Sequence, residues 1–452
     1  MERDVTLLEM LEAREDRARR LEALRTRHGS AAVSFTLNIA GPVKDSPLIR
    51  RAFQAGLEQL EAGLRAAGLA VLDRLERRAP TGCEAQYAVD GPVRELQRAC
   101  VSIEDGSPLG RLFELDVLTP EGRRLDREAA GGAPRRCLVC GAPGTGCASR
   151  RIHTAEELQA ATRRLLEGHF ASADRERAAA LVTRALLDEV GTTPKPGLVD
   201  RANTGSHRDM DIFTFHASAA ALFPYWANCV QLGQETADQP PASTFSALRR
   251  AGQGAERTMF AATGGVNTHK GAVFTLGVLC GAIGRLWSAE APCRDPERIL
   301  TECASIAAAV TEDLASLDPA SARTAGQRLY LEHGLTGVRG EAAQGFPSVA
   351  RTALPVLRAG LAAGLSRNDA GTAALLRLIA QGTDTNLISR GGPERAAAAA
   401  ERCQRLLQRS PFPAAEEIAR LDREFIQENL SPGGCADLLA AAFFLQSWEL
   451  AS

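Results

Sequence analysis

Residues 110–117 read GRLFELDV, a stretch in which apolar and acidic side chains alternate. Successive side chains of a β-strand point to opposite faces, so a strand over residues 112–118 would bury its apolar side chains on one face. The same period of two would place Glu114 and Asp116 together on the other face. The stretch therefore predicts a sheet in the first part of the chain that presents two carboxylates side by side.

The pattern of apolar residues changes along the chain. Before about residue 150, β-type runs lie between helical patterns, and these runs are 32–39, 84–89 and 98–103. After about residue 175, Ala- and Leu-rich helical patterns follow one another almost without strand candidates. We therefore expect an α/β N-terminal domain over residues 1–168 and an all-α C-terminal domain over residues 175–452.

The composition is that of a globular protein without a strong charge field. Of the 452 residues, 45% are hydrophobic and 24% are charged, which excludes a disordered or fibrous chain. Because 53 Lys and Arg face 55 Asp and Glu, no basic field exists to hold nucleic acid or an anionic membrane. The N-terminal sequence MERDVTLLEM lacks the features of an export signal, and the uncharged runs are too short or too interrupted to span a bilayer. We expect a cytoplasmic protein with reduced cysteines.

Glu114 and Asp116 are candidate ligands for Mg²⁺. Hard cations prefer carboxylate oxygens, and two acids spaced along a strand in this way can hold Mg²⁺ against a triphosphate, as in nucleotidyltransferases. Lys44, in the loop GPVKDS, and Arg111, beside the acids, are candidate phosphate partners. The alternatives are two acids on the solvent face of an edge strand and two solvated surface cations.

Cys137, Cys140, Cys147 and His153 form a C-x₂-C-x₆-C-x₅-H spacing in a Gly- and Pro-rich stretch. Four soft ligands at this spacing suit a closed, tetrahedral Zn²⁺ site over residues 137–153. Three ordinary cysteines and an exposed histidine are the alternative. A zinc knuckle that binds RNA is disfavoured, because this segment lacks interleaved aromatic residues and the chain lacks a basic surplus.

Three stretches of the first half carry a resemblance: SFTLNIAGPVKDS (34–46), GRLFELDVLTPEG (110–122) and PRRCLVC (134–140). Together they resemble the holo-citrate lyase synthase family, also called apo-citrate lyase phosphoribosyl-dephospho-CoA transferase. The resemblance implies a nucleotidyltransferase-like domain that attaches phosphoribosyl-dephospho-CoA to a serine of the apo-citrate lyase acyl carrier (gamma) subunit and releases pyrophosphate. The family's acidic motif usually has two Asp, and Glu114 takes the first place here.

Polar, glycine-rich segments interrupt the helical patterns of the second half, and such loops are where an all-α enzyme places its chemistry. Asp209 and Asp211 are candidates for a metal or general-base role, although Asp211 is also well placed to cap the helix that follows. The segment TGGVNTHKG (263–271) opens an apolar helix, where free N–H groups favour a phosphate and Lys270 adds a charge. His269 is either a proton donor or a hydrogen-bonded core histidine.

Five segments follow one another over some 270 residues: TPKPGLVD (193–200), NTGSHRDMD (203–211), TGGVNTHKG (263–271), DTNLISRGG (384–392) and SPGGCADLLA (431–440). Together they closely resemble the triphosphoribosyl-dephospho-CoA synthase family. The resemblance implies ATP and 3′-dephospho-CoA as substrates and free adenine as the second product. In the implied reaction, the 2′-hydroxyl of dephospho-CoA attacks C1′ of the ATP ribose as the bond to adenine breaks.

The implied reaction assigns roles to polar residues of these segments. An oxocarbenium-like transition state needs a carboxylate, an acid for the leaving adenine, and cations on the retained triphosphate. Asp209 and Asp211 fit the first need and His269 the second. Asp384 and Asp437 are candidate Mg²⁺ ligands, although Asp437 alternatively only complements a helix dipole. The candidate substrate contacts are Lys195, Arg201, Asn203, His207, Asn267, Lys270, Asn386 and Arg390.

The two halves together predict a bifunctional enzyme of citrate lyase maturation, in which one half makes the precursor and the other transfers it. Maturation of malonate decarboxylase, which uses the same precursor synthase family, is an alternative within this class. Another alternative is an N-glycoside hydrolase, in which water replaces the ribose hydroxyl. In a third, the first half is a non-catalytic docking module that recruits the carrier.

Overall fold

The chain divides into two structural units. The computed structural model describes residues 2–128, 131–142, 147, 150–310, 328, 330–332 and 334–451. One unit comprises Met1–Ser172 with Ala289–Ala291, and the other comprises Ala173–Ser288 with Pro292–Ser452. Helix α5 (Ala155–Gly191) runs through the segment in which the two units are divided, so the chain passes from one unit to the other without a loop.

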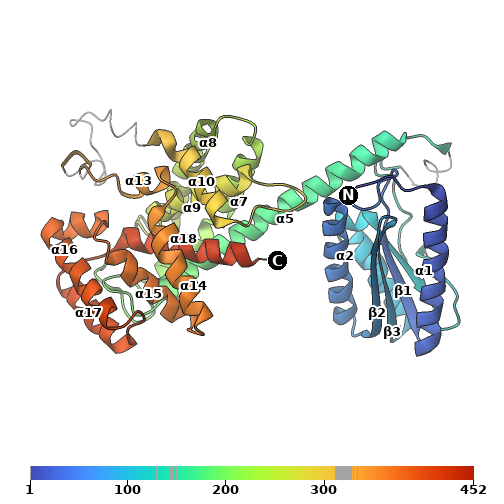
Figure 1. Cartoon of the computed structure of the whole chain (residues 1–452), viewed down its shortest axis with the longest axis horizontal. Helices are drawn as coiled ribbons and strands as arrows, with labels where there is room; N and C mark the ends of the chain where they lie inside the picture. The colour runs from blue at the N-terminus through green and yellow to red at the C-terminus, as the bar shows by residue number, and fades with distance from the viewer. Residues whose placement is uncertain are drawn as a thin grey trace. The chain divides into compact units, whose positions relative to one another are not determined.

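The first unit is built on an antiparallel sheet with strand order β2-β3-β1-β4. Helix α1 lies on one side of this sheet and α2 on the other (Figure 1). Thr36 on β1 lies opposite both Glu84 on β3 and Glu114 on β4, so a row of polar side chains crosses the sheet. The elements are α1 (Leu7–His28), β1 (Ala31–Leu37), α2 (Pro47–Ala66), β2 (Ala70–Ala79), β3 (Gly82–Asp90), α3 (Val93–Asp105), the 3₁₀ turn η1 (Leu109–Leu112) and β4 (Phe113–Leu118).

The alternation in GRLFELDV appears in the burial of β4. Phe113, Leu115 and Val117 are buried, whereas the residues between them are half-exposed. On the buried face, Phe35 of β1 stacks on Phe53 of α2 with ring centroids 5.1 Å apart, and Phe113 meets Phe35 edge-on at 5.3 Å. This aromatic cluster fixes the opposite, polar face of the sheet toward α1.

Two elements of the first unit differ from the sequence-based expectation. Residues 98–103, predicted as a strand, belong to helix α3, because Leu96, Cys100 and Val101 repeat at helical spacing and are buried on one side. Strand β2 was not predicted. Its side chains are mostly exposed, so no alternation of burial marks it, and its backbone pairing with β3 defines it instead.

The described secondary structure elements of the second unit are all helices, as the sequence predicts. None of the described helices is long and apolar enough to cross a membrane. Beyond α5 and the π-helical turn Val349–Ala353, the helices are α6 (Ile212–Ala221), α7 (Phe223–Glu235), α8 (Pro241–Ala262), α9 (Lys270–Arg285), α10 (Pro296–Ala307), α13 (Gly337–Ala343), α14 (Leu354–Ala362), α15 (Arg367–Ile379), α16 (Thr385–Arg409), α17 (Ala415–Gln427) and α18 (Gly433–Leu450).

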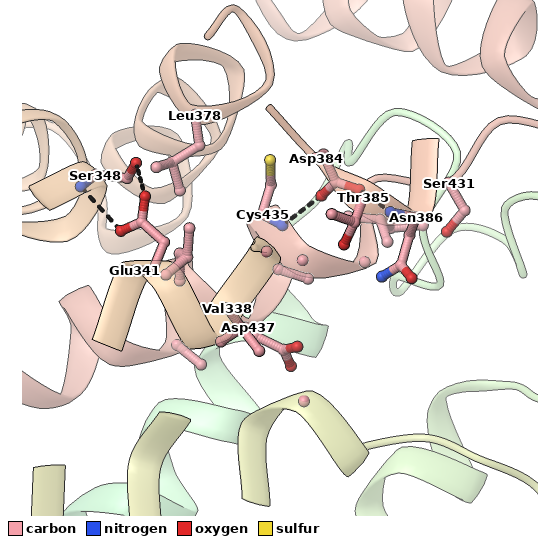
Figure 2. A pocket seen from close by; sticks show the side chains of 18 of the residues that line it. Val338, Glu341, Ser348, Leu378, Asp384, Thr385, Asn386, Ser431, Cys435 and Asp437 are labelled. Carbon is pink, nitrogen blue, oxygen red and sulfur yellow. Dashed lines mark hydrogen bonds between the residues drawn. The ribbon is translucent and has the colours of Figure 1, made fainter. Parts of the chain in front are cut away.

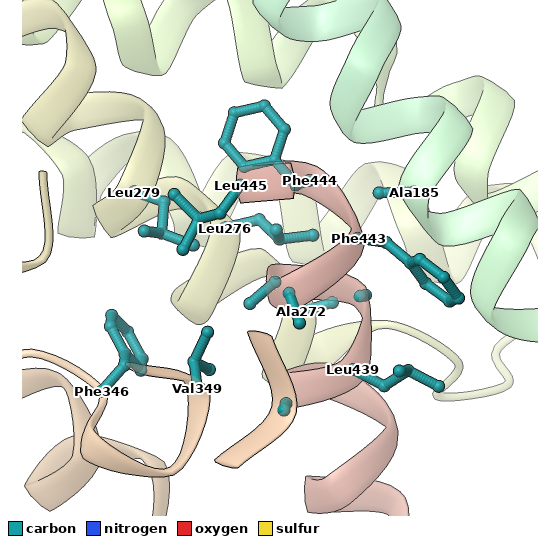
Figure 3. Packing of buried hydrophobic residues seen from close by; sticks show 14 of the residues in the cluster. Ala185, Ala272, Leu276, Leu279, Phe346, Val349, Leu439, Phe443, Phe444 and Leu445 are labelled. Atoms are coloured by element: carbon teal, nitrogen blue, oxygen red, sulfur yellow. The ribbon is translucent and has the colours of Figure 1, made fainter. Parts of the chain in front are cut away.

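Helix α18 lies at the centre of this unit. Its side chains from Leu439 to Leu445 are buried around the whole circumference of the helix, which matches its continuously apolar sequence. Figure 3 shows Phe443, Phe444 and Leu445 projecting from α18 in different directions among neighbouring helices. Burial of each such side chain contributes about 1.5–3 kcal/mol. The position of the α18 N-terminus is therefore set by the core of the unit.

Helices α7 and α9 approach each other through glycines. A Cβ atom at Gly284 would lie 2.1 Å from the carbonyl oxygen of Val230, and one at Gly233 would lie 2.2 Å from the carbonyl oxygen of Gly281. Both distances are shorter than a van der Waals contact, so the two backbones are in direct contact and leave no room for a side chain at either glycine. The orientation of α9, whose N-terminus carries TGGVNTHKG, depends on this contact.

We predict that Gly284→Ala lowers the free energy of unfolding by about 1–3 kcal/mol, because the new methyl group must push α7 away from α9. The matched control is Gly168→Ala on α5, where a Cβ atom meets nothing within 4 Å. That change should raise stability by about 0.5–1 kcal/mol through helix propensity. Urea unfolding measures both variants, and equal effects of the two would contradict the packing described.

Candidate active site

The second unit contains a cavity of about 1010 Å³ at which the five glycine-rich segments meet. The N-termini of α9, α16 and α18 all contribute to its lining, and Figure 2 shows side chains from the last two facing it. Unpaired N–H groups at a helix N-terminus attract anions, and three such ends meet at this cavity. The predicted site residues in the lining are Lys195, His207, Asp209, Asn267, His269, Lys270, Asp384, Asn386, Arg390 and Asp437.

Asp384 joins two of these helix ends. One carboxylate oxygen accepts the N–H groups of Asn386 at 2.8 Å and Leu387 at 2.9 Å in the first turn of α16. The other accepts the N–H of Cys435 at 2.7 Å in the first turn of α18 (Figure 2). Burial raises the pKa of Asp384, and the three N–H groups oppose that rise. The carboxylate thereby holds the two N-termini side by side.

Asp437 lies against the start of the third helix, α9. A Cβ atom at Gly271 would lie 1.8 Å from its carboxylate oxygen, so only glycine permits this approach. Burial raises the pKa of Asp437 well above its usual value, and the nearby carboxylates of Glu189 and Asp384 raise it further. Among the residues that the structure describes, no Lys, Arg or His pairs with this carboxylate. The site therefore has an unneutralised acid beside three helix N-termini.

Lys195 forms a buried ion pair in the wall of the cavity. Its Nζ donates to Glu189 Oε1 on α5 at 2.5 Å, and both side chains are almost fully buried. Burial raises the pKa of Glu189, and the Lys195 ammonium opposes this shift. Sequence reasoning missed Glu189, although an acid at a position that continues the apolar stripe of Val182 and Leu186 was the available signal.

His269 is held as a neutral imidazole. Its Nδ1 lies 2.7 Å from Ser218 Oγ, which in turn accepts a hydrogen bond from Thr268 Oγ1 at 2.8 Å. The Ser218 hydroxyl is then available to donate to Nδ1, which leaves the proton of the ring on Nε2. Burial lowers the pKa of His269 to about 3, and the charge of Lys195 adds to this effect. Nε2 is buried and has no hydrogen-bond partner among the described residues.

His207 and Arg390 lie together at another part of the cavity. Arg390 donates to His207 Nδ1 at 3.2 Å and to the carbonyl oxygen of Ser206 at 3.0 Å. A guanidinium only donates, so Nδ1 accepts and His207 Nε2 carries the proton toward Ser431 Oγ, 2.9 Å away. Burial, with the Arg390 charge, lowers the pKa of His207.

Three predicted residues of the second half do not line the cavity. Asp211 caps α6 by accepting the N–H of Thr214 at 2.9 Å, which is the structural alternative that the sequence left open. Arg201 donates to Asn368, and Asn203 donates to Asp422 at 2.9 Å. These contacts organise the loops behind the cavity.

The first unit has a smaller cavity, of about 100 Å³, between α1 and the polar face of the sheet. Glu114 and Lys44 line it together with Glu84, Arg14 and Arg17, which were not predicted. The Lys44 ammonium donates to the carbonyl oxygen of Ile39 at 2.5 Å, and burial together with the Arg14 charge lowers its pKa.

The other two predicted residues of the first unit lie outside this lining. Asp116 lies beyond Glu114 on the same face of β4, where it pairs with Arg124. Burial raises the pKa of Asp116, and the Glu114 charge adds to that rise. Arg111 has Arg135, Arg127 and Asp105 as its charged neighbours.

The predicted metal-ligand residues of the stretch 137–153 lie together. The ligand atoms of Cys137, Cys140, Cys147 and His153 are all within 4.8 Å of one another. The pKa of the Cys140 thiol is lowered to about 6, mainly because the backbone N–H of Ala142 stabilises the thiolate. Residues 143–146, 148 and 149 of this stretch lie outside the described residues.

We predict that His269 makes the stability of the chain depend on pH. The folded state keeps the His269 imidazole neutral, because its pKa is lowered to about 3, whereas the unfolded chain binds a proton below about pH 6.5. The neutral imidazole therefore contributes fully to stability above pH 6.5, and this contribution is lost as the pH falls toward 3. When the pH is lowered from 7.0 to 5.5, the free energy of unfolding of the wild type should fall by about 1 kcal/mol relative to that of His269→Asn. Urea unfolding at both pH values measures this difference. His216→Asn, an exposed position on α6, serves as control, and a constant difference for His269→Asn would contradict the prediction.

Comparisons with known proteins match both units. Residues 5–169 match the CitX family model, described as apo-citrate lyase phosphoribosyl-dephospho-CoA transferase, and residues 175–452 match the CitG model, described as ATP:dephospho-CoA triphosphoribosyl transferase. Protein CitXG of Haemophilus influenzae is 35% identical over 456 residues, and the match covers 98% of this chain and 97% of that protein.

Two further relatives support these matches. Protein CitXG of Leuconostoc mesenteroides subsp. cremoris is 32% identical over 465 residues, covering 98% of this chain and 97% of the relative. The 2-(5″-triphosphoribosyl)-3′-dephosphocoenzyme-A synthase of Pectobacterium atrosepticum is 46% identical over 267 residues, covering 58% of this chain and 86% of the relative. Both resemblances predicted from the sequence are confirmed. The chain belongs to the CitXG family, a transferase of citrate lyase maturation in which a CitX domain is fused to a CitG domain.

Proposed function

We propose that the cavity of the second unit binds ATP and 3′-dephospho-CoA and forms 2′-(5″-triphosphoribosyl)-3′-dephospho-CoA with release of adenine. The observation that carries this proposal is the meeting of three helix N-termini with an unneutralised carboxylate, Asp437, in one cavity. A triphosphate suits the helix ends, where Arg390 and the half-exposed Lys270, which pairs with Glu256 at 3.0 Å, offer positive charge. The volume of about 1010 Å³ is sufficient for large substrates.

We assign different cavity residues to different steps of the glycosyl transfer. The 2′-hydroxyl oxygen of dephospho-CoA bonds to C1′ of the ATP ribose, the C1′–N9 bond breaks, and its electron pair leaves with adenine. Of the two acids predicted as base, only Asp209 lines the cavity, and we assign it to accept the hydroxyl proton. We assign His269 Nε2–H to donate a hydrogen bond to the departing adenine, whose N9 then takes its proton from water, because this N–H is buried and has no partner among the described residues.

Mg²⁺ fits this site through Asp437. A buried carboxylate with a raised pKa and no cationic partner in the described residues suits a hard divalent ion. When bound there, Mg²⁺ would neutralise charge on the retained triphosphate. Asp384 was also predicted as a ligand, but its oxygens accept three backbone N–H groups, so we assign it to holding the helix ends.

We expect Asp437→Asn to reduce the rate of adenine release by about 100-fold or more, because it removes charge that stabilises the reacting complex. Adenine is measured by chromatography with ATP, Mg²⁺ and 3′-dephospho-CoA. Asp295→Asn, at an exposed helix cap outside the cavity, should keep the wild-type rate. A wild-type rate in Asp437→Asn would contradict the assignment, and release without dephospho-CoA would indicate hydrolysis instead.

For the first unit we propose a nucleotidyltransferase-like transfer of phosphoribosyl-dephospho-CoA to the acyl carrier subunit of apo-citrate lyase. The hydroxyl oxygen of the carrier serine bonds to the α-phosphorus of the precursor, the bond to pyrophosphate breaks, and the serine proton passes to solvent. Glu114 and Asp116, on one face of β4, are the carboxylates assigned to Mg²⁺. Lys44 and Arg17, beside Glu114 in the same cavity, supply positive charge for the phosphates.

Glu114→Gln should slow carrier labelling by about 100-fold or more when preformed triphosphoribosyl-dephospho-CoA is supplied, because it removes a charge that holds the metal. Adenine release by the same variant should be unchanged, since that reaction belongs to the other unit. Labelling is followed by intact mass of the carrier. Glu95→Gln, exposed on α3, is the matched control. Wild-type labelling by Glu114→Gln would favour a docking role for the first unit.

A further inference from the structure

The three thiols and the imidazole between residues 137 and 153 are arranged around a common point. Their ligand atoms lie within 4.8 Å of one another, and Cys140 Sγ is 3.4 Å from Cys147 Sγ. A disulfide would need about 2.05 Å between these sulfurs. With Zn–S bonds of about 2.3 Å, tetrahedral geometry separates two sulfurs by about 3.8 Å. The observed distances, from 3.4 Å between these two sulfurs to at most 4.8 Å within the cluster, bracket this separation, so the four ligand atoms are close enough to share one ion.

We propose that Cys137, Cys140, Cys147 and His153 bind one structural Zn²⁺ ion, with His153 coordinating through Nε2. This nitrogen is buried and has no hydrogen-bond partner in the described part of the chain. The other ring nitrogen, Nδ1, lies 3.7 Å from the Glu157 carboxylate at the start of α5. Zinc-bound histidines commonly direct their second nitrogen to a carboxylate, which fixes the tautomer and orients the ring.

The segment needs such a ligand because it has little core of its own. In residues 131–142 and 150–154, Leu138 and Val139 are only half-buried, and Ile152 is exposed. Its first part is held by ion pairs from Arg127 and Arg135 to the buried Glu104. A short segment that buries so little apolar surface is usually fastened by a metal or a disulfide.

The ion would join two parts of the first unit. Cys137 and Cys140 lie in a tight turn, in which the N–H of Gly141 donates to the carbonyl oxygen of Cys137 at 3.0 Å. His153 lies directly before α5. Four protein ligands leave no position for substrate, so the role is structural: the metal fixes the start of α5 to the turn.

The test is the metal content of the full-length chain, measured by plasma mass spectrometry after purification without chelators and again after dialysis with zinc alone. We expect one zinc per chain, and a cobalt-substituted chain should show the absorption of tetrahedral thiolate coordination. Cys140→Ser and His153→Ala should lose most of the zinc, whereas Cys293→Ser, a buried cysteine of the second unit, should retain it. Circular dichroism checks that the variants are folded.

A milder variant keeps the test informative if the ligand variants fail to fold. Glu157→Gln retains all four ligands, and it should weaken zinc binding by about 10–100-fold in competition with a chelator, because the carboxylate no longer supports His153. Zinc below one-tenth per chain in the reconstituted wild type, or a Cys140–Cys147 disulfide in the freshly purified chain, would overturn the proposal. Unchanged zinc affinity in Glu157→Gln would overturn coordination through Nε2.

Discussion

The carboxylate of Asp384 accepts hydrogen bonds from the first turns of α16 and α18, and the arrangement of the larger cavity depends on this contact. Two helix N-termini repel each other through their positive ends, so a shared anion is what allows them to lie together. The apolar burial of α18 sets the position of one end, and the glycine contact between α7 and α9 sets the third end. Packing that is far from the cavity thereby determines where its N–H groups point.

The two units provide positive charge for phosphates in different ways. The second unit combines backbone dipoles with Lys270 and Arg390, whereas its Lys195 is already neutralised by Glu189. The first unit relies on side-chain cations such as Lys44 and Arg17, placed by α1 and a loop beside the polar face of the sheet. In each unit, a carboxylate faces the same cavity as that unit's positive charge. A magnesium triphosphate requires this combination of a carboxylate and positive charge.

Local patterns made part of this structure predictable. The alternation in GRLFELDV placed Glu114 and Asp116 correctly on one face, and the glycine-rich segments of the second half indeed meet at one cavity. Strand β2 was missed because backbone pairing defines it, while its side chains stay exposed. Ser218 lies 51 residues from His269 in the sequence, so no local spacing could connect the two. Asp211 fitted two roles in the sequence, and only its contacts show that it caps α6.

We propose that one chain both makes the precursor and transfers it. The most direct measurement is the intact mass of the citrate lyase acyl carrier subunit after incubation with the full-length chain, ATP, 3′-dephospho-CoA and Mg²⁺. The account predicts that a serine of the carrier gains one phosphoribosyl-dephospho-CoA group, with one adenine and one pyrophosphate released per group added. An unmodified carrier in a reaction that accumulates adenine would contradict the fusion of the two activities in this chain.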